Sequence, residues 1–159
     1  MGFSLEYILG EHTGVILTVL GVGISIFLAG YGSSIGVGIA GEAAAALIKE
    51  KPELFGQALV MQLLPATQGL YGFVIGVILL LRIDPSLSAT DGWVNLLASL
   101  PVAIAGYTSA PYQGRVSAAG MQLIAQRPEN AAQGIVFSAM VETYAILGFV
   151  GSILITVFY

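Results

Sequence analysis

Apolar residues fill four long stretches of the chain, and short groups of charged and turn-forming residues separate them. The stretches cover residues 14–48, 54–82, 93–125 and 130–158. An α-helix rises about 1.5 Å per residue, so about 20 apolar residues cross the hydrocarbon core of a bilayer. Every stretch exceeds that length. The pattern predicts an all-α protein with a single membrane domain, residues 1–159, whose four transmembrane helices tilt or extend beyond the lipid.

The composition also indicates a membrane protein surrounded by lipid. The 159 residues are 57% hydrophobic and only 9% charged, whereas soluble domains contain about 25% charged residues. The mean hydropathy is +0.91. The formal net charge of −4 is thinly spread, so no surface for nucleic acid is expected. The absence of cysteine excludes a disulfide, a thiolate metal site and a cysteine nucleophile.

The second half of the chain repeats the first at a shift of 76 residues. The shift places Lys51-Pro52-Glu53 on Arg127-Pro128-Glu129, Ala29-Gly30-Tyr31 on Ala105-Gly106-Tyr107, and Gly72-Phe73-Val74 on Gly148-Phe149-Val150. So many matches in one register predict a duplicated helical hairpin, with residues 14–82 as the first copy and residues 93–158 as the second. Because each hairpin crosses the membrane twice, the two repeats run parallel.

Charge predicts the orientation in the cell membrane. The two hairpin loops carry the basic residues Lys49, Lys51 and Arg127, while the opposite end carries Arg82 among the acidic residues Asp84, Asp91, Glu6 and Glu11. Positively charged loops stay on the cytoplasmic side of a membrane. We therefore expect cytoplasmic hairpin loops and both termini on the outer side.

Small residues recur along the first and third predicted helices. They are Gly30, Gly32, Gly36 and Gly38 in the first, and Gly106, Ala110, Gly114 and Ala118 in the third. Such spacing lets helix backbones approach closely in lipid. Two interpretations remain open: packing within one molecule, or a tight inner wall where helices from many copies converge.

Glu142 is a lone carboxylate in the middle of the fourth stretch. The 76-residue shift places it opposite Ala66, and it places Gln113 opposite Val37. Glu142 lies thirteen residues beyond Glu129, which corresponds to about 20 Å of helix from the hairpin loop, near the bilayer middle. A carboxylate at that depth is costly and is by default functional. We therefore predict that Glu142 carries a cation across the membrane.

Other polar groups share the level of Glu142. Leu64, Thr67, Gln68 and Tyr71 follow helical spacing along one face of the second stretch, and Gln113 lies fourteen residues before Arg127. Pro65 and Pro111 lack an N–H, which predicts local distortions that present backbone oxygen to an ion. A structural interpretation is open for each polar residue: Thr67 can bond a carbonyl of its own helix, Gln68 and Gln113 can join helices, and Tyr71 can be ordinary core.

Oxygen atoms around one carboxylate favour a monovalent hard cation. The candidates are the carboxylate of Glu142, the Thr67 hydroxyl, the amides of Gln68 and Gln113, and the Leu64 carbonyl. Arg115, the one intramembrane base, lies nearer the loops and can extend its side chain toward water. Na⁺ is therefore the expected ion, because a proton would need only Glu142 and an acceptor. We expect the Tyr71 hydroxyl to donate to Glu142 and hold the site closed.

These segments resemble the family of K (c, or proteolipid) subunits of bacterial V-type ATPases, especially the sodium-pumping kind. The resemblance covers nearly the whole chain and is carried by GVG at 36–38, GEAAAAL at 41–47, QLLPATQGLYG at 62–72 and AMVETYAILG at 139–148. It implies sodium ligation by Leu64, Thr67, Gln68, Gln113 and Glu142, with Tyr71 as the lid. Ala66, between the proline and the threonine, is a minor departure that affects no ligand.

The same resemblance implies a rotor in which identical subunits form a membrane ring. The ring turns against a membrane stator subunit that bears an essential arginine, and central-stalk subunits connect it to a soluble head that hydrolyses ATP. The chain itself then has no catalytic residue. Alternatives are a proton-translocating ring of the same type, a small transporter or channel that works alone, and a purely structural proteolipid. Neither the inverted repeats nor the several intramembrane charges expected of a transporter are visible.

Overall fold

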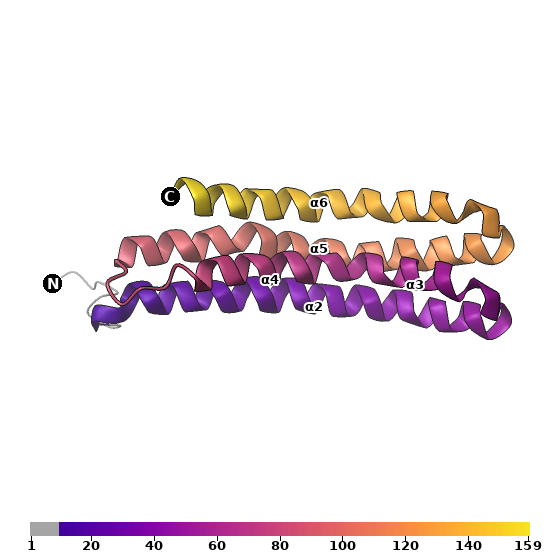
Figure 1. Ribbon diagram of the computed structural model, residues 1–159, viewed down its shortest axis with the longest axis horizontal. Coiled ribbons are helices and arrows are strands. Elements are labelled where there is room, and N and C mark those ends of the chain that lie inside the picture. Colours follow the sequence, from indigo (N-terminus) through magenta and orange to yellow (C-terminus); the bar gives the residue numbers. More distant parts are fainter. Residues whose placement is uncertain (1–9) are drawn as a thin grey trace.

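The computed structural model describes residues 10–159 and consists of two helical hairpins (Figure 1). The first hairpin contains α2 (Thr13–Glu50), α3 (Phe55–Leu63) and α4 (Thr67–Leu80); the second contains α5 (Ala89–Gln126) and α6 (Ala131–Phe158). Short 3₁₀ turns occupy Gly10–His12, Pro52–Leu54, Leu64–Ala66 and Pro128–Asn130. Glu6, used above for orientation, lies outside the described residues. The C-terminus and the start of α2 lie at one end of the bundle, and both hairpin loops lie at the other.

The repeat predicted from the sequence is also present in the backbone of the two hairpin loops. Lys51 (φ −134°, ψ 75°) and Arg127 (φ −140°, ψ 81°) end α2 and α5 in nearly the same conformation. Their N–H groups donate to the carbonyls of Leu47 and Leu123, four residues earlier. A proline follows each of them and opens a 3₁₀ turn, where its missing N–H removes no hydrogen bond.

Three helical segments are long and apolar enough to cross a membrane: Thr13–Glu50, Pro52–Leu80 and Pro128–Phe158. The fourth, α5, is also 38 residues long but carries more polar residues. Many of these face other helices, because Asn95, Ser99, Gln113 and Ser117 are almost completely buried within the single chain. Its lower hydropathy therefore reflects a central position, since α5 contacts both α2 and α6.

The second crossing is interrupted at Pro65. The turn Leu64–Ala66 is 3₁₀ rather than α-helical, and it separates α3 from α4. This is the distortion expected there, because proline cannot donate to the carbonyl of Met61. The prediction of a similar interruption at Pro111 is wrong, since α5 remains one α-helix across that residue. Ala110, beside Pro111, packs directly against Gly36 of α2.

Helices α2 and α5 pack backbone against backbone through glycines. A Cβ atom on Gly32 would lie 2.6 Å from the Cα of Tyr107, and one on Gly114 would lie 2.7 Å from the Cα of Gly36. By contrast, a Cβ on Gly30 or Gly38 would meet nothing within 4 Å. Some of the small residues therefore serve packing within one molecule, and Gly30 and Gly38 face open space.

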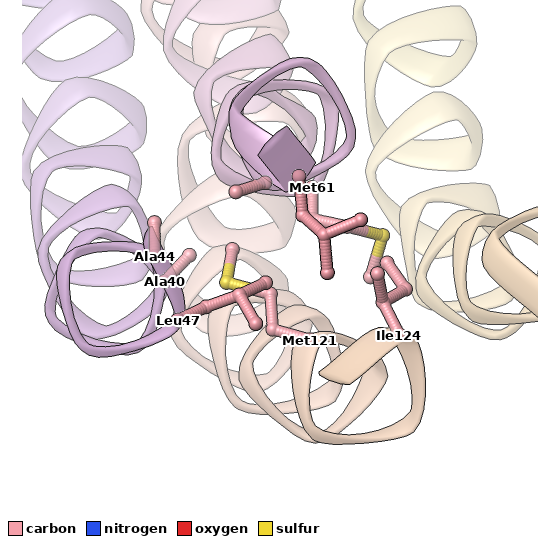
Figure 2. Packing of buried hydrophobic residues seen from close by; sticks show 8 residues of the cluster. Ala40, Ala44, Leu47, Met61, Met121 and Ile124 are labelled. Atoms are coloured by element: carbon pink, nitrogen blue, oxygen red, sulfur yellow. The ribbon is translucent and has the colours of Figure 1, made fainter. Parts of the chain in front are cut away.

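Close to the hairpin loops, a buried hydrophobic cluster joins the two hairpins. Figure 2 shows six of its members converging from α2, α3 and α5: Ala40, Ala44, Leu47, Met61, Met121 and Ile124. Leu54 and Ala58 complete the cluster. Because Met61 comes three residues before the break, this packing anchors α3 and determines where the interrupted segment meets α5.

Candidate functional site

The interruption at Pro65 gathers polar groups around the carbonyl of Leu64. The Thr67 hydroxyl donates to this oxygen at 2.9 Å, and the Thr67 N–H also donates to it. Thr67 thus makes the hydrogen bond to a nearby backbone carbonyl that was left open above. The hydroxyl lies 3.4 Å from Oε1 of Gln68 as well.

Ser33 of α2 supports the same interruption, and sequence reasoning missed it. Its Oγ accepts a hydrogen bond of 2.7 Å from the N–H of Gly69, in the first turn of α4. The first N–H groups of a helix lack partners within it, so Ser33 caps α4 from a neighbouring helix. Its counterpart one repeat on, Ser109, is buried with a hydroxyl that has no hydrogen-bond partner among the described residues.

Glu142 lies where α6 faces α4 and α5. The Tyr71 hydroxyl donates to Oε1 of Glu142, which is the bond expected from the sequence. Nε2 of Gln113 donates to Oε2 of Glu142 at 3.4 Å, and Nε2 of Gln68 donates to Oε1 of Gln113. A continuous hydrogen-bonded chain therefore runs from Gln68 through Gln113 to the carboxylate, whose second oxygen is held by Tyr71.

The side chains of the site differ in exposure, and therefore in how directly an ion or a partner could reach them. Gln68 and Gln113 are 0% exposed, and an unpaired amide at such a place would be costly. Glu142 is half-buried and lies beside Met140 and Tyr144, which are 61% and 68% exposed. The carboxylate is thus at the edge of the bundle, with the amides behind it and the outer surface in front.

Tyr71 is held in place by its ring. The ring stacks on Phe149 of α6 with centroids 5.0 Å apart, and the hydroxyl reaches Glu142 on the same helix. Tyr71 therefore connects α4 to α6 on one side of the carboxylate. On the side nearer the hairpin loops, Ser117 and Ser138 share a 2.8 Å hydrogen bond between α5 and α6.

All six residues predicted to surround the ion come together in one region, which takes contributions from both hairpins. Leu64, Thr67, Gln68 and Tyr71 belong to the first, and Gln113 and Glu142 to the second. Within the described residues, no group of three or more His, Cys, Asp or Glu side chains could hold a metal ion. The site therefore combines one carboxylate with neutral oxygens, and a monovalent cation would balance the single negative charge of an ionised carboxylate, whereas a divalent cation would leave excess positive charge.

Arg115 does not neutralise Glu142 in this structure. Its guanidinium lies over the ring of Tyr112, 5.5 Å from the centroid, and both side chains are exposed on the surface of the single chain. Across the part of the chain described by the structure, Arg115 and Glu142 form no ion pair.

Comparisons with known proteins match nearly the whole chain. The family model for ATP synthase C subunits matches residues 20–79 and again residues 96–155, two segments 76 residues apart. The chain is 50% identical over 151 residues to a V-type sodium ATPase subunit K of Enterococcus hirae, covering 95% of this chain and 97% of that relative. It is 38% identical over 143 residues to an A-type ATP synthase subunit K of Methanocaldococcus jannaschii, covering 90% of this chain and 63% of that longer relative.

Proposed function

The chain belongs to the family of ATP synthase C subunits, and from that premise we propose that it is the sodium-carrying component of a rotary ATPase ring in the cell membrane. The observation that carries the proposal is the placement of Glu142, a single carboxylate surrounded by uncharged oxygen-bearing groups of both hairpins. Membership supports the coarser part, an ion-translocating rotor subunit. Sodium as the ion is our inference from the polar groups and from the name of the Enterococcus hirae relative.

Two side chains contact the carboxylate of Glu142 directly. Its two oxygens accept hydrogen bonds, one from Tyr71 and one from Gln113. A half-turn of the Gln113 amide would bring its oxygen to the place of its N–H group. We propose that entry of Na⁺ causes this turn, so that the ion replaces an N–H donor with its own positive charge.

The remaining oxygens complete the coordination that we propose. The Thr67 hydroxyl and the Leu64 carbonyl lie together at the helix interruption, and Gln68 lies between them and Gln113. An ion bound by Leu64, Thr67, Gln68, Gln113 and Glu142 would be neutralised by a single negative charge. A neutral site can then pass along the lipid, where an isolated charge would be very costly.

We propose that ring rotation carries this neutral site between two half-channels. At a stator arginine, the guanidinium pairs with Glu142 and displaces the ion; beyond it, the carboxylate reloads from the opposite side. The half-exposed position of Glu142 at the edge of the bundle suits contact from outside the ring. The work comes from ATP hydrolysis in a separate soluble head, coupled through the central stalk, and the hairpin loops face the cytoplasm toward that head.

Carbodiimide labelling of Glu142 in the purified ring tests the ion identity. These reagents attack a protonated carboxyl, so a bound cation protects it. At fixed pH, millimolar Na⁺ is expected to lower the labelling rate at least about tenfold, as for an ion present at about nine times its Kd, while K⁺ serves as the matched control. A labelling rate that responds to pH alone, with no effect of Na⁺, would favour the proton-translocating ring and contradict the sodium proposal.

Tyr71→Phe should weaken the closure of the site without removing a ligand. The variant keeps the ring that stacks on Phe149 and loses only the hydroxyl that donates to Glu142. A hydrogen bond to a charged group contributes about 1.5–3 kcal/mol, so we expect sodium affinity to fall roughly 10- to 100-fold. Tyr144→Phe, which removes an exposed hydroxyl from α6, is the control. Equal affinities in both variants, measured by sodium protection from labelling, would exclude a closing role for Tyr71.

A further inference from the structure

We propose that Ser33, which is not one of the proposed ligands, sets the sodium affinity of the site by holding the helix interruption at Pro65. The inference deepens the proposed function and rests on it, because the interruption carries the Leu64 carbonyl, one of the proposed ligands. Ser33 acts on the ion only through the backbone of a neighbouring helix, and it is therefore a positioning residue.

The first two turns of α4 carry three residues of the site. They are Thr67, Gln68 and Tyr71. The first N–H groups of a helix have no partner within that helix, so the position of a helix end depends on the acceptors around it. Whatever fixes the start of α4 therefore also fixes two proposed ligands and the tyrosine that closes the site.

Ser33 of α2 supplies one of these acceptors. Its Oγ accepts a hydrogen bond of 2.7 Å from the N–H of Gly69. In a continuous α-helix this N–H would donate to the carbonyl of Pro65, four residues earlier. The bond to Ser33 thus favours an interrupted crossing, in which the Leu64 carbonyl accepts from both the hydroxyl and the N–H of Thr67.

Close packing of the interrupted crossing on α2 brings Ser33 within reach of this N–H. A Cβ on Gly69 would lie 3.1 Å from Oγ of Ser33 and 3.5 Å from Cα of Gly30. On the other side of the break, a Cβ on Gly36 would lie 2.8 Å from Cβ of Pro65. Glycine at positions 36 and 69 therefore lets α2 contact the crossing both before and after the break.

The second hairpin has neither the proline nor the glycines of this contact, and α6 is unbroken. The 76-residue shift gives Tyr112, Val141 and Ala145 as the counterparts of Gly36, Pro65 and Gly69. Helix α6 runs from Ala131 to Phe158 and passes through the counterpart of the break. The second hairpin therefore shows the same pair of helices without an interruption to support.

The serine at the corresponding place in the second hairpin lacks a partner. Ser33 and its counterpart Ser109 are equally buried, each 7% exposed. The hydroxyl of Ser109, however, has no hydrogen-bond partner among the described residues. The same residue type at the same burial thus accepts a backbone N–H only where the neighbouring helix is interrupted, which connects Ser33 to the break and not to general helix packing.

Sodium protection from carbodiimide labelling, measured on purified Ser33→Ala rings, tests the proposal. The variant leaves the Gly69 N–H without its acceptor. We expect sodium affinity to fall roughly tenfold, which is the effect of a lost helix cap if all of it appears in ion binding. Ser109→Ala is the matched control, because it removes the same group at the same burial from a helix pair without an interruption. Its sodium affinity should equal that of the unmodified ring.

A second variant and a second ion separate positioning from packing. Ser33→Cys has nearly the size of serine but offers only a weak acceptor, so it should lose sodium affinity as Ser33→Ala does. Li⁺ is smaller than Na⁺ and is satisfied by fewer oxygens, so a displaced Leu64 carbonyl should lower the ratio of sodium affinity to lithium affinity several-fold. A loosened bundle would bind both ions less tightly to the same extent.

The positioning role would be overturned by unchanged sodium affinity in either Ser33 variant, by an equal loss in Ser109→Ala, or by an unchanged ratio of the two affinities. Native mass spectrometry checks that each ring is assembled, and if Ser33→Ala does not assemble, Ser33→Cys carries the test alone. The proposed function fails separately, if sodium gives no protection even to the unmodified ring.

Discussion

Glu142→Gln is expected to reduce ATP-driven sodium transport to background. Glutamine has nearly the shape of glutamate and can still accept from Tyr71, so the packing of α6 against α4 and α5 should persist. It cannot neutralise a cation, however, and an ion held by neutral oxygens alone would remain charged in lipid at a cost of several kcal/mol. The measurement is radioactive sodium uptake into vesicles containing the complete ATPase with the variant ring.

The control for this change is a carboxylate outside the site. Glu42→Gln removes one charge from an exposed position on α2 and should leave uptake close to that of the unmodified protein. Assembly of both variants is checked by the mass of the ring. Sodium uptake that survives in an assembled Glu142→Gln ring would show that the ion takes another path, and the proposed carrier role would then be wrong.

Gln113→Leu is expected to lower sodium affinity by roughly 10- to 100-fold while Glu142 remains reactive. The change removes one proposed ligand and leaves Nε2 of Gln68 buried without its partner. The contact of a polar group with a charge contributes about 1.5–3 kcal/mol, and each 1.4 kcal/mol corresponds to about tenfold in affinity. Carbodiimide labelling should therefore proceed normally without sodium and require much more sodium for protection.

Gln122→Leu is the matched control for Gln113→Leu, since it makes the same exchange at an exposed position of the same helix. Its sodium affinity should equal that of the unmodified ring. If both variants were protected at the same sodium concentration, the two buried glutamines would serve only to join helices. The proposal for the coordination would then lose Gln113, although Glu142 could still be the carrier.

Sequence reasoning predicted the helices and their duplication well because both depend on local patterns. The four apolar stretches lie within a few residues of the observed helices, and the two loops share a Lys/Arg-Pro-Glu motif with the same backbone conformation. The start of α5 at Ala89 came earlier than the apolar stretch predicted. Ser88 explains the difference, since its hydroxyl accepts from the N–H of Asp91 and caps the helix before its apolar part begins.

The parts that could not be predicted depend on contacts between helices. Pro65 and Pro111 look alike in the sequence, yet only Pro65 lies at an interruption, although both Pro65 and Ala110 pack against Gly36 of α2. Ser33 is one of several serines in α2, and only the position of Gly69 across the interface identifies it as a cap. Helical spacing placed Gln68 on one face with Thr67 and Tyr71, and the distance from Arg127 placed Gln113 at the same depth. Neither gave the order in which the two amides bond to each other and to Glu142.

The site lies between the two hairpins of one chain, and its counterpart one repeat away has Ala66 where Glu142 would stand. On the proposed function, only every second contact between hairpins around the ring binds an ion. A full turn then moves half as many ions as it would if every hairpin held a carboxylate. Since the energy of a turn is shared among fewer ions, each can be moved against a steeper gradient. A single carboxylate for every two hairpins thus lowers the number of ions moved per turn and raises the gradient against which each ion can be moved.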